Sequence, residues 1–121
     1  MTQHILIVDD EKNIAISVDY LLRREGFDVS VAHDGEEGLK LIKSLHPDLV
    51  LLDVMMPKLN GFEVCEAVKG DPALASVRII MLTAKGRDAE KEKGLNLGAD
   101  AYITKPFATR DLVAQVKALL K

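Results

Sequence analysis

The sequence lacks a second cysteine that could pair with Cys65, and it lacks any long hydrophobic run. An internal disulfide is therefore excluded, and a single thiol suits a reducing cytoplasm. The N-terminal residues, Met-Thr-Gln-His before the apolar run 5–8, have neither the basic region nor the long apolar stretch of a signal peptide. No apolar run approaches membrane-spanning length. We therefore expect a cytoplasmic protein without membrane contacts.

An excess of positive charge is also missing. The net charge is −3 and the sequence pI is about 5.6, so we do not expect this chain to bind nucleic acid directly. His4, His33 and His46 are dispersed and lack the spacing of metal ligands. The 121 residues are 48% hydrophobic and 29% charged, and no linker or low-complexity segment interrupts them. The sequence therefore predicts one globular domain over residues 1–121.

Short apolar runs alternate with helical periodicity five times along the chain. The expected strands cover 4–8, 27–32, 48–52, 77–82 and 100–104. The expected helices cover about 11–25, 35–45, 61–69 and 87–97, followed by a last helix. We expect Gly26 to end the first helix, Leu45 to belong to the inward stripe of the second, and Thr109 to be the N-cap of the last. The fourth helix is too polar to bury much surface.

The strands expected at 48–52 and 77–82 are apolar apart from Asp48 and Arg78 near their starts, as in a parallel sheet covered on both faces. Alternation of strands and helices favours right-handed crossovers, and five units are too few for a closed eight-stranded barrel. We therefore predict an α/β fold: a doubly wound, five-stranded parallel sheet in the order 2-1-3-4-5 with five helices, of the flavodoxin-like type. Ligands of such sheets bind beyond the carboxyl ends of the strands, here between the first and third.

Polar residues stand at the carboxyl ends of four expected strands: Asp9 with Asp10, Asp53, Thr83 and Lys105. Each alone has an ordinary alternative role as a helix N-cap or a solvated charge, but together at one edge they favour a functional site. Two carboxylates about 5 Å apart repel by roughly 3 kcal/mol at an effective dielectric constant of about 20. Lys105 offsets one charge, and a hard divalent cation such as Mg²⁺ is the natural partner of the rest. These are the parts of a phosphoryl-transfer site.

Four segments carry a resemblance to a known family. They read Ile-Leu-Ile-Val-Asp-Asp at 5–10, Asp-Val-Met-Met-Pro-Lys-Leu-Asn-Gly at 53–61, Met-Leu-Thr-Ala at 81–84 and Gly-Ala-Asp-Ala-Tyr-Ile-Thr-Lys-Pro-Phe at 98–107. Over its whole length the chain resembles the receiver domain of bacterial two-component response regulators. The resemblance implies a phosphoacceptor signalling switch rather than an enzyme with separate substrates. Its only reactions would be its own phosphorylation on Asp53, by a sensor histidine kinase or phosphotransfer protein, and autodephosphorylation.

The same resemblance implies a set of metal ligands. Asp10 and Asp53 would bind Mg²⁺ together with the backbone carbonyl of Met55, and Asp9 would act largely through water. Met55 and Lys85 occupy positions that tune the lifetime of the phosphoaspartate in this family.

Further residues would sense the phosphoryl group. Thr83 would donate a hydrogen bond to a phosphoryl oxygen, and Lys105 would pair with it. Movement of Thr83 would let Tyr102 turn inward, so both are candidate switch residues. Tyr102 also has an ordinary alternative role as a strand aromatic, since neighbouring strand positions alternate faces. The resemblance implies a cis peptide bond between Lys105 and Pro106, although base rates alone favour trans.

The family's signalling face consists of the fourth helix, the fifth strand and the last helix, and it would control a partner or an attached output domain. Segment 98–120 resembles receivers attached to winged-helix transcription factors. However, Ala101 and Gln115 stand where those relatives often place charged residues for dimer salt bridges. A monomer and a phosphorylation-dependent homodimer both stay open, as do a single-domain regulator and a receiver within a longer protein.

Two other functions remain as alternatives. A phosphatase of the haloacid-dehalogenase type also combines an aspartate nucleophile with Mg²⁺, threonine and lysine. Its Asp-x-Asp signature follows the first strand, whereas Asp9 and Asp10 are adjacent here and the expected nucleophile follows the third strand. The other alternative is a phosphorylation-independent interaction module. All five key side chains are present, which argues against a loss of the chemistry.

Overall fold

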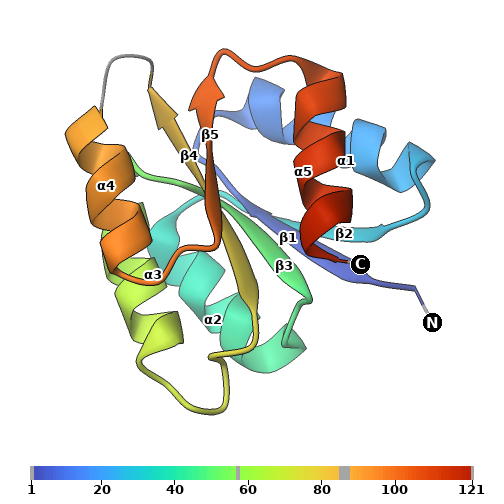
Figure 1. Ribbon diagram of the computed structural model, residues 1–121. Helices are drawn as coiled ribbons and strands as arrows, with labels where there is room; N and C mark the ends of the chain where they lie inside the picture. The colour runs from blue at the N-terminus through green and yellow to red at the C-terminus, as the bar shows by residue number, and fades with distance from the viewer. Residues whose placement is uncertain (1, 57, 85–87, 121) are drawn as a thin grey trace.

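The computed structural model describes residues 2–56, 58–84 and 88–120. Two residues named above, Pro57 and Lys85, lie outside these ranges. Within them, five strands alternate with five helices (Figure 1). All neighbouring strands pair in parallel, in the order β2-β1-β3-β4-β5. The predicted fold class and strand order are therefore confirmed. The described helices do not include one with the length and hydrophobicity required to cross a bilayer.

The element bounds agree with the predicted ones to within two residues. The strands are β1 (His4–Val8), β2 (Asp28–Ala32), β3 (Leu49–Asp53), β4 (Arg78–Ala84) and β5 (Ala101–Lys105). The helices are α1 (Lys12–Arg24), α2 (Gly35–Leu45), α3 (Gly61–Lys69), α4 (Asp88–Asn96) and α5 (Thr109–Leu119). The last three strands extend further toward their carboxyl ends than predicted, so Asp53, Thr83 and Lys105 are strand residues.

The sheet is the middle of three layers, with α1 and α5 on one face and α2, α3 and α4 on the other (Figure 1). Alternate strand residues supply the two cores, as the pleat requires. The core under α1 and α5 contains the buried strand residues Ile5, Ile7, Leu49, Leu51, Ile80, Leu82 and Ile103. The opposite core contains Leu6, Val8, Val50, Leu52, Ile79 and Met81. The place of a strand's last residue in this alternation therefore decides which face of the sheet its side chain joins.

Helix ends explain where the chain turns. Asp34 caps α2, and its carboxylate accepts a hydrogen bond of 2.8 Å from the backbone N–H of Glu37. Asn60 and Glu63 form a reciprocal capping box at the start of α3. Gly26 follows α1 with φ of +95°, the left-handed conformation that ends a helix, as predicted.

Two predictions about helix residues are wrong. Thr109 is the first residue of α5 rather than its N-cap, because the carbonyl of Ala108 already accepts from the backbone N–H groups of Asp111 and Leu112. Leu45 is 41% exposed rather than inward. It is the last residue of α2, and the chain turns away at His46, which has left-handed backbone angles.

Helix α4 is bound only lightly to the rest of the molecule. Its one buried position among the described residues is Gly94, which packs under Met81. Two lysines of α4 lie over aromatic rings: the ammonium of Lys91 is 4.1 Å from the ring centre of Tyr102, and that of Lys93 is 4.6 Å from that of Phe62. This helix therefore depends on cation–π contacts where the others depend on a buried apolar stripe.

Candidate functional site

Three charged side chains continue the alternation of the α1/α5 core at the carboxyl ends of their strands. Asp53 follows the buried residues Leu49 and Leu51 at the same parity, and Lys105 follows Ile103. Asp9 lies two residues beyond Ile7, at the same parity, just after the end of β1. Because the strands are parallel, these residues reach the same edge on the same side of the sheet.

The carboxylates of Asp9, Asp10 and Asp53 form a compact cluster. One oxygen from each lies within 4.8 Å of the others. Asp9 is fully buried and Asp53 is 6% exposed, whereas Asp10 is exposed. The backbone N–H of Met55 donates to Asp53 Oδ1 at 3.3 Å, while the Met55 side chain is 63% exposed. Three convergent carboxylate oxygens with one open side fit a hard divalent cation that keeps some of its water.

Among the described residues, Lys105 brings positive charge to this cluster. Its Nζ lies 3.0 Å from Asp9 Oδ2, 3.3 Å from Asp53 Oδ2 and 3.1 Å from Glu11 Oε1. Sequence reasoning missed Glu11. The sequence feature that could have indicated Glu11 is its place directly after Asp9 and Asp10. However, a glutamate there is equally consistent with an ordinary solvated charge at the start of α1.

Burial and charge shift the pKa values of this cluster. Removal of Asp53 from solvent is the main cause that raises its pKa to about 7, and the negative charge of Asp9 adds to the effect while Lys105 opposes it. For Lys105, burial lowers the pKa, but hydrogen bonding to Asp9 and the charges of Asp53 and Asp9 outweigh it, so the net shift is upward. Without a bound cation, the cluster therefore holds more negative charge than Lys105 alone can balance.

Thr83 and Tyr102 belong to the opposite face of the sheet. Tyr102 pairs in register with Met81, and Thr83 pairs with Thr104. Because these positions differ by two residues along each strand, Thr83 and Tyr102 project to the face covered by α4. Thr83 is 3% exposed, and the Tyr102 ring is partly buried beneath Lys91. The structure thus brings Asp9, Asp10, Asp53 and Lys105 together and places Tyr102 apart from them, against α4.

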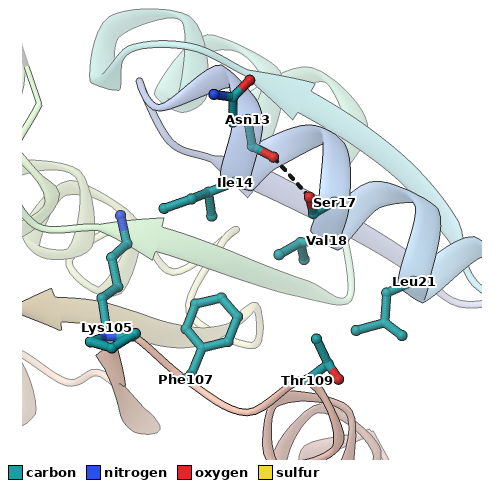
Figure 2. Close-up of a pocket in the computed structure, with 9 residues that line it drawn as sticks. Asn13, Ile14, Ser17, Val18, Leu21, Lys105, Phe107 and Thr109 are labelled. Atoms are coloured by element: carbon teal, nitrogen blue, oxygen red, sulfur yellow. Dashed lines mark hydrogen bonds between the residues drawn. The ribbon is translucent and has the colours of Figure 1, made fainter.

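An apolar groove of about 310 Å³ lies beside the carboxylate cluster, between α1 and the segment that joins β5 to α5 (Figure 2). Ile14, Val18 and Leu21 of α1 face Phe107 across it, and the stem of Lys105 closes one end. The Lys105–Pro106 peptide bond at this end is cis, as the family resemblance implied. A molecule bound in the groove would contact the Lys105 side chain at this end.

A model of the response regulator receiver domain matches residues 5–117 of the chain. The chain belongs to the response regulator receiver domain family. It is 49% identical, over all of its length, to the alkaline phosphatase synthesis transcriptional regulatory protein PhoP of Bacillus subtilis (strain 168), and spans 50% of that protein. The chain is thus a receiver domain of two-component signalling, as the sequence predicted. It spans about half the length of this curated relative.

Solved receivers have the same fold. A CheY-like response regulator receiver domain protein from Methanospirillum hungatei JF-1 matches with a TM-score of 0.93 and 35% identity, covering 99% of this chain and 94% of the other. The chemotaxis response regulator CheY4 of Vibrio cholerae matches with a TM-score of 0.92 and 30% identity, covering 98% and 99% of the two chains. Receivers bind Mg²⁺ at an acidic pocket, and this chain has a cluster of three carboxylates at Asp9, Asp10 and Asp53.

Proposed function

We propose that this receiver is a phosphoacceptor switch in which Asp53 takes a phosphoryl group from the phosphohistidine of a sensor histidine kinase or a phosphotransfer protein. The observation that carries the proposal is the Lys105 ammonium, which lies 3.3 Å from Asp53 Oδ2 at the edge of the three-carboxylate cluster. A nucleophile, a fixed cation and an ion site within a few ångströms are what phosphoryl transfer requires.

The reaction starts from the ionised Asp53. One carboxylate oxygen attacks phosphorus as the bond from phosphorus to the histidine nitrogen breaks, and the electron pair of that bond stays on the nitrogen. Lys105 holds positive charge beside the transferred group. The Thr83 hydroxyl, displaced toward the group from the α4 side of the sheet, donates a hydrogen bond to one of its oxygens. Mg²⁺ held by Asp9, Asp10, Asp53 and the carbonyl of Met55 would neutralise the charge on the phosphoryl oxygens. The product is an acyl phosphate on Asp53, which water hydrolyses.

The output part of the proposal concerns the face formed by α4, β5 and α5. Displacement of Thr83 toward the phosphoryl group would open space on the α4 side of the sheet, where Tyr102 lies. The light anchoring of α4 makes this face the natural one to rearrange. We propose that its change controls a partner or an attached output domain, in the cytoplasm, with residues 1–121 folding as one domain and acting as a monomer or a phosphorylation-dependent dimer.

Intact mass after incubation with acetyl phosphate tests the proposal. We expect the natural chain to gain one phosphoryl group when Mg²⁺ is present, and neither the natural chain without Mg²⁺ nor Asp53→Asn with Mg²⁺ to gain it. No adduct, and no binding of the phosphoryl analogue beryllofluoride, would instead support a phosphorylation-independent interaction module. Continuous phosphate release from many phosphate esters would support the phosphatase.

A further inference from the structure

The Lys105 ammonium is already shared among three carboxylates before any phosphoryl group arrives. An ammonium has three N–H donors, and three carboxylates lie within 3.3 Å of Nζ: those of Asp9, Asp53 and Glu11. Lys105 donates hydrogen bonds to Asp9 and Glu11, whereas its contact with Asp53 is an ion pair of 3.3 Å. A phosphoryl group on Asp53 would therefore compete with Asp9 and Glu11 for the ammonium.

The two hydrogen-bond partners, Asp9 and Glu11, differ in how easily they can release the ammonium. The Asp9 side chain is completely buried and also accepts a hydrogen bond of 2.9 Å from the backbone N–H of Glu11, so without its cation it would be a buried, underpaired charge. The Glu11 side chain is 57% exposed, and water can replace Lys105 around its carboxylate at little cost. Glu11 is therefore the partner that Lys105 can leave.

The backbone position of Glu11 does not depend on its side chain. Glu11 is the N-cap residue of α1, yet its side chain makes no capping hydrogen bond. Its backbone N–H is held by Asp9, and its carbonyl accepts from the N–H of Ala15. The carboxylate thus forms no hydrogen bond with the helix; it reaches from the β1–α1 turn to the residue at the end of β5.

We propose that Glu11 is a positioning residue that competes with the phosphoryl group for Lys105, and that phosphorylation exchanges one counter-ion for the other. This inference rests on the proposed function of Asp53. In the unphosphorylated chain Glu11 holds the ammonium at the mouth of the site. When the phosphoryl oxygen takes its place, the tie between the β1–α1 turn and the end of β5 is lost. Glu11 therefore weakens the phosphorylated state without touching the phosphoryl group.

The test measures the affinity for beryllofluoride in the presence of Mg²⁺ by calorimetric titration, together with the rate of adduct formation from acetyl phosphate. Three variants are compared with the natural chain. Glu11→Ala removes the competitor. Glu11→Asp keeps its charge but, being shorter by roughly 1.5 Å, withdraws it from Lys105. Glu36→Ala removes an exposed glutamate from the first turn of α2 as a matched control. We expect Glu11→Ala and Glu11→Asp both to tighten beryllofluoride binding by about two- to fivefold, the range of an exposed ion pair, and to speed adduct formation, with Glu36→Ala unchanged.

Several results would overturn the inference. If Glu11→Asp behaved as the natural chain while Glu11→Ala bound more tightly, general repulsion by the charge would explain the effect and the contact with Lys105 would not. Weaker binding in Glu11→Ala would show that Glu11 helps Lys105 rather than competing for it. If the natural chain itself bound no beryllofluoride and formed no adduct, the proposed function would fail with it, whereas normal binding unaffected by either Glu11 variant would reject this inference alone.

Discussion

At the scale of single residues, Asp53, the proposed nucleophile, lies in surroundings that favour its neutral form. Its side chain is almost fully buried, Asp9 lies beside it, and the pKa is raised to about 7. A carboxyl group with the ordinary aspartate pKa of about 3.9 is ionised at pH 7 without a neighbouring cation. Positive charge is therefore needed to favour the ionised form of Asp53, and Lys105 supplies only part of it.

The raised pKa of Asp53 predicts how stability depends on pH in a buffer free of divalent cations. An unfolded aspartate has a pKa of about 3.9, so between about pH 4 and pH 7 the folded chain binds more protons than the unfolded chain. The free energy of unfolding should fall as pH rises through this window. Asp53→Asn lacks this loss, and we expect it to gain about 2 kcal/mol over the natural chain between pH 5 and pH 8. Denaturant unfolding with a chelator measures this, with the exposed Asp28→Asn as control; parallel pH profiles for all three chains would contradict it.

Residue roles differ in how far the sequence reveals them. The end of a strand and its parity can be read from apolar runs, which is why Asp9, Asp53 and Lys105 could be expected at one edge. Glu11 could not be assigned in the same way, because its contact depends on the path of a long lysine side chain arriving from β5. The covering of Tyr102 by Lys91 was equally invisible, since the two residues lie on different elements.

At the scale of elements, α4 differs from the other helices in what holds it. The periodic apolar stripes of α1, α3 and α5 could be read from the sequence, and so could the absence of a stripe in α4. The exact residue at which α5 begins could not, because the backbone carbonyl of Ala108 starts the helix without any side-chain signal. The sequence is therefore most informative where burial is extensive.

The cation–π contact predicts a local effect of a charge-removing substitution in α4. Lys91→Met keeps the length of the side chain but loses the ammonium over Tyr102. Since such a contact contributes about 0.5–1 kcal/mol, we expect amide hydrogen exchange in α4 to speed up by about two- to fivefold. Exchange measured by NMR should be unchanged in Lys40→Met, at an exposed position of α2. Equal protection of α4 in both variants would count against this anchoring role.

Gly61 ties the start of α3 to the end of β3. A Cβ added there would lie 2.4 Å from the carbonyl oxygen of Asp53 and 2.9 Å from Val54 Cα, both backbone atoms that cannot rotate away. We expect Gly61→Ala to lower the free energy of unfolding by about 2–4 kcal/mol, despite the better helix propensity of alanine. Glu66→Ala, exposed on the same helix, should change it by less than about 0.5 kcal/mol. Urea unfolding compares the two, and similar midpoints would show that the β3–α3 connection yields easily.

At the scale of the whole molecule, cation binding and folding should be linked. Unfolding disperses Asp9, Asp10 and Asp53, so Mg²⁺ should stabilise the folded chain by about 1.4 kcal/mol at ten times its dissociation constant, provided that the unfolded chain does not bind it. Asp10→Asn should relieve repulsion in the cation-free chain and reduce the dependence on Mg²⁺. Thermal unfolding over a Mg²⁺ series measures both effects. A Tm indifferent to Mg²⁺ in the natural chain would argue against the ion site.

Tyr102 and Lys105 are separated by three positions on one strand, and this odd number has a consequence for how the domain tolerates change. It directs the lysine to the side of α1 and α5, and the tyrosine to the side of α4. Substitutions leave this arrangement intact, but inserting or deleting one residue between them would send both side chains to the same side of the sheet. The spacing itself, more than the identity of the residues between, keeps Lys105 with the carboxylate cluster on one face of the sheet and Tyr102 against α4 on the other.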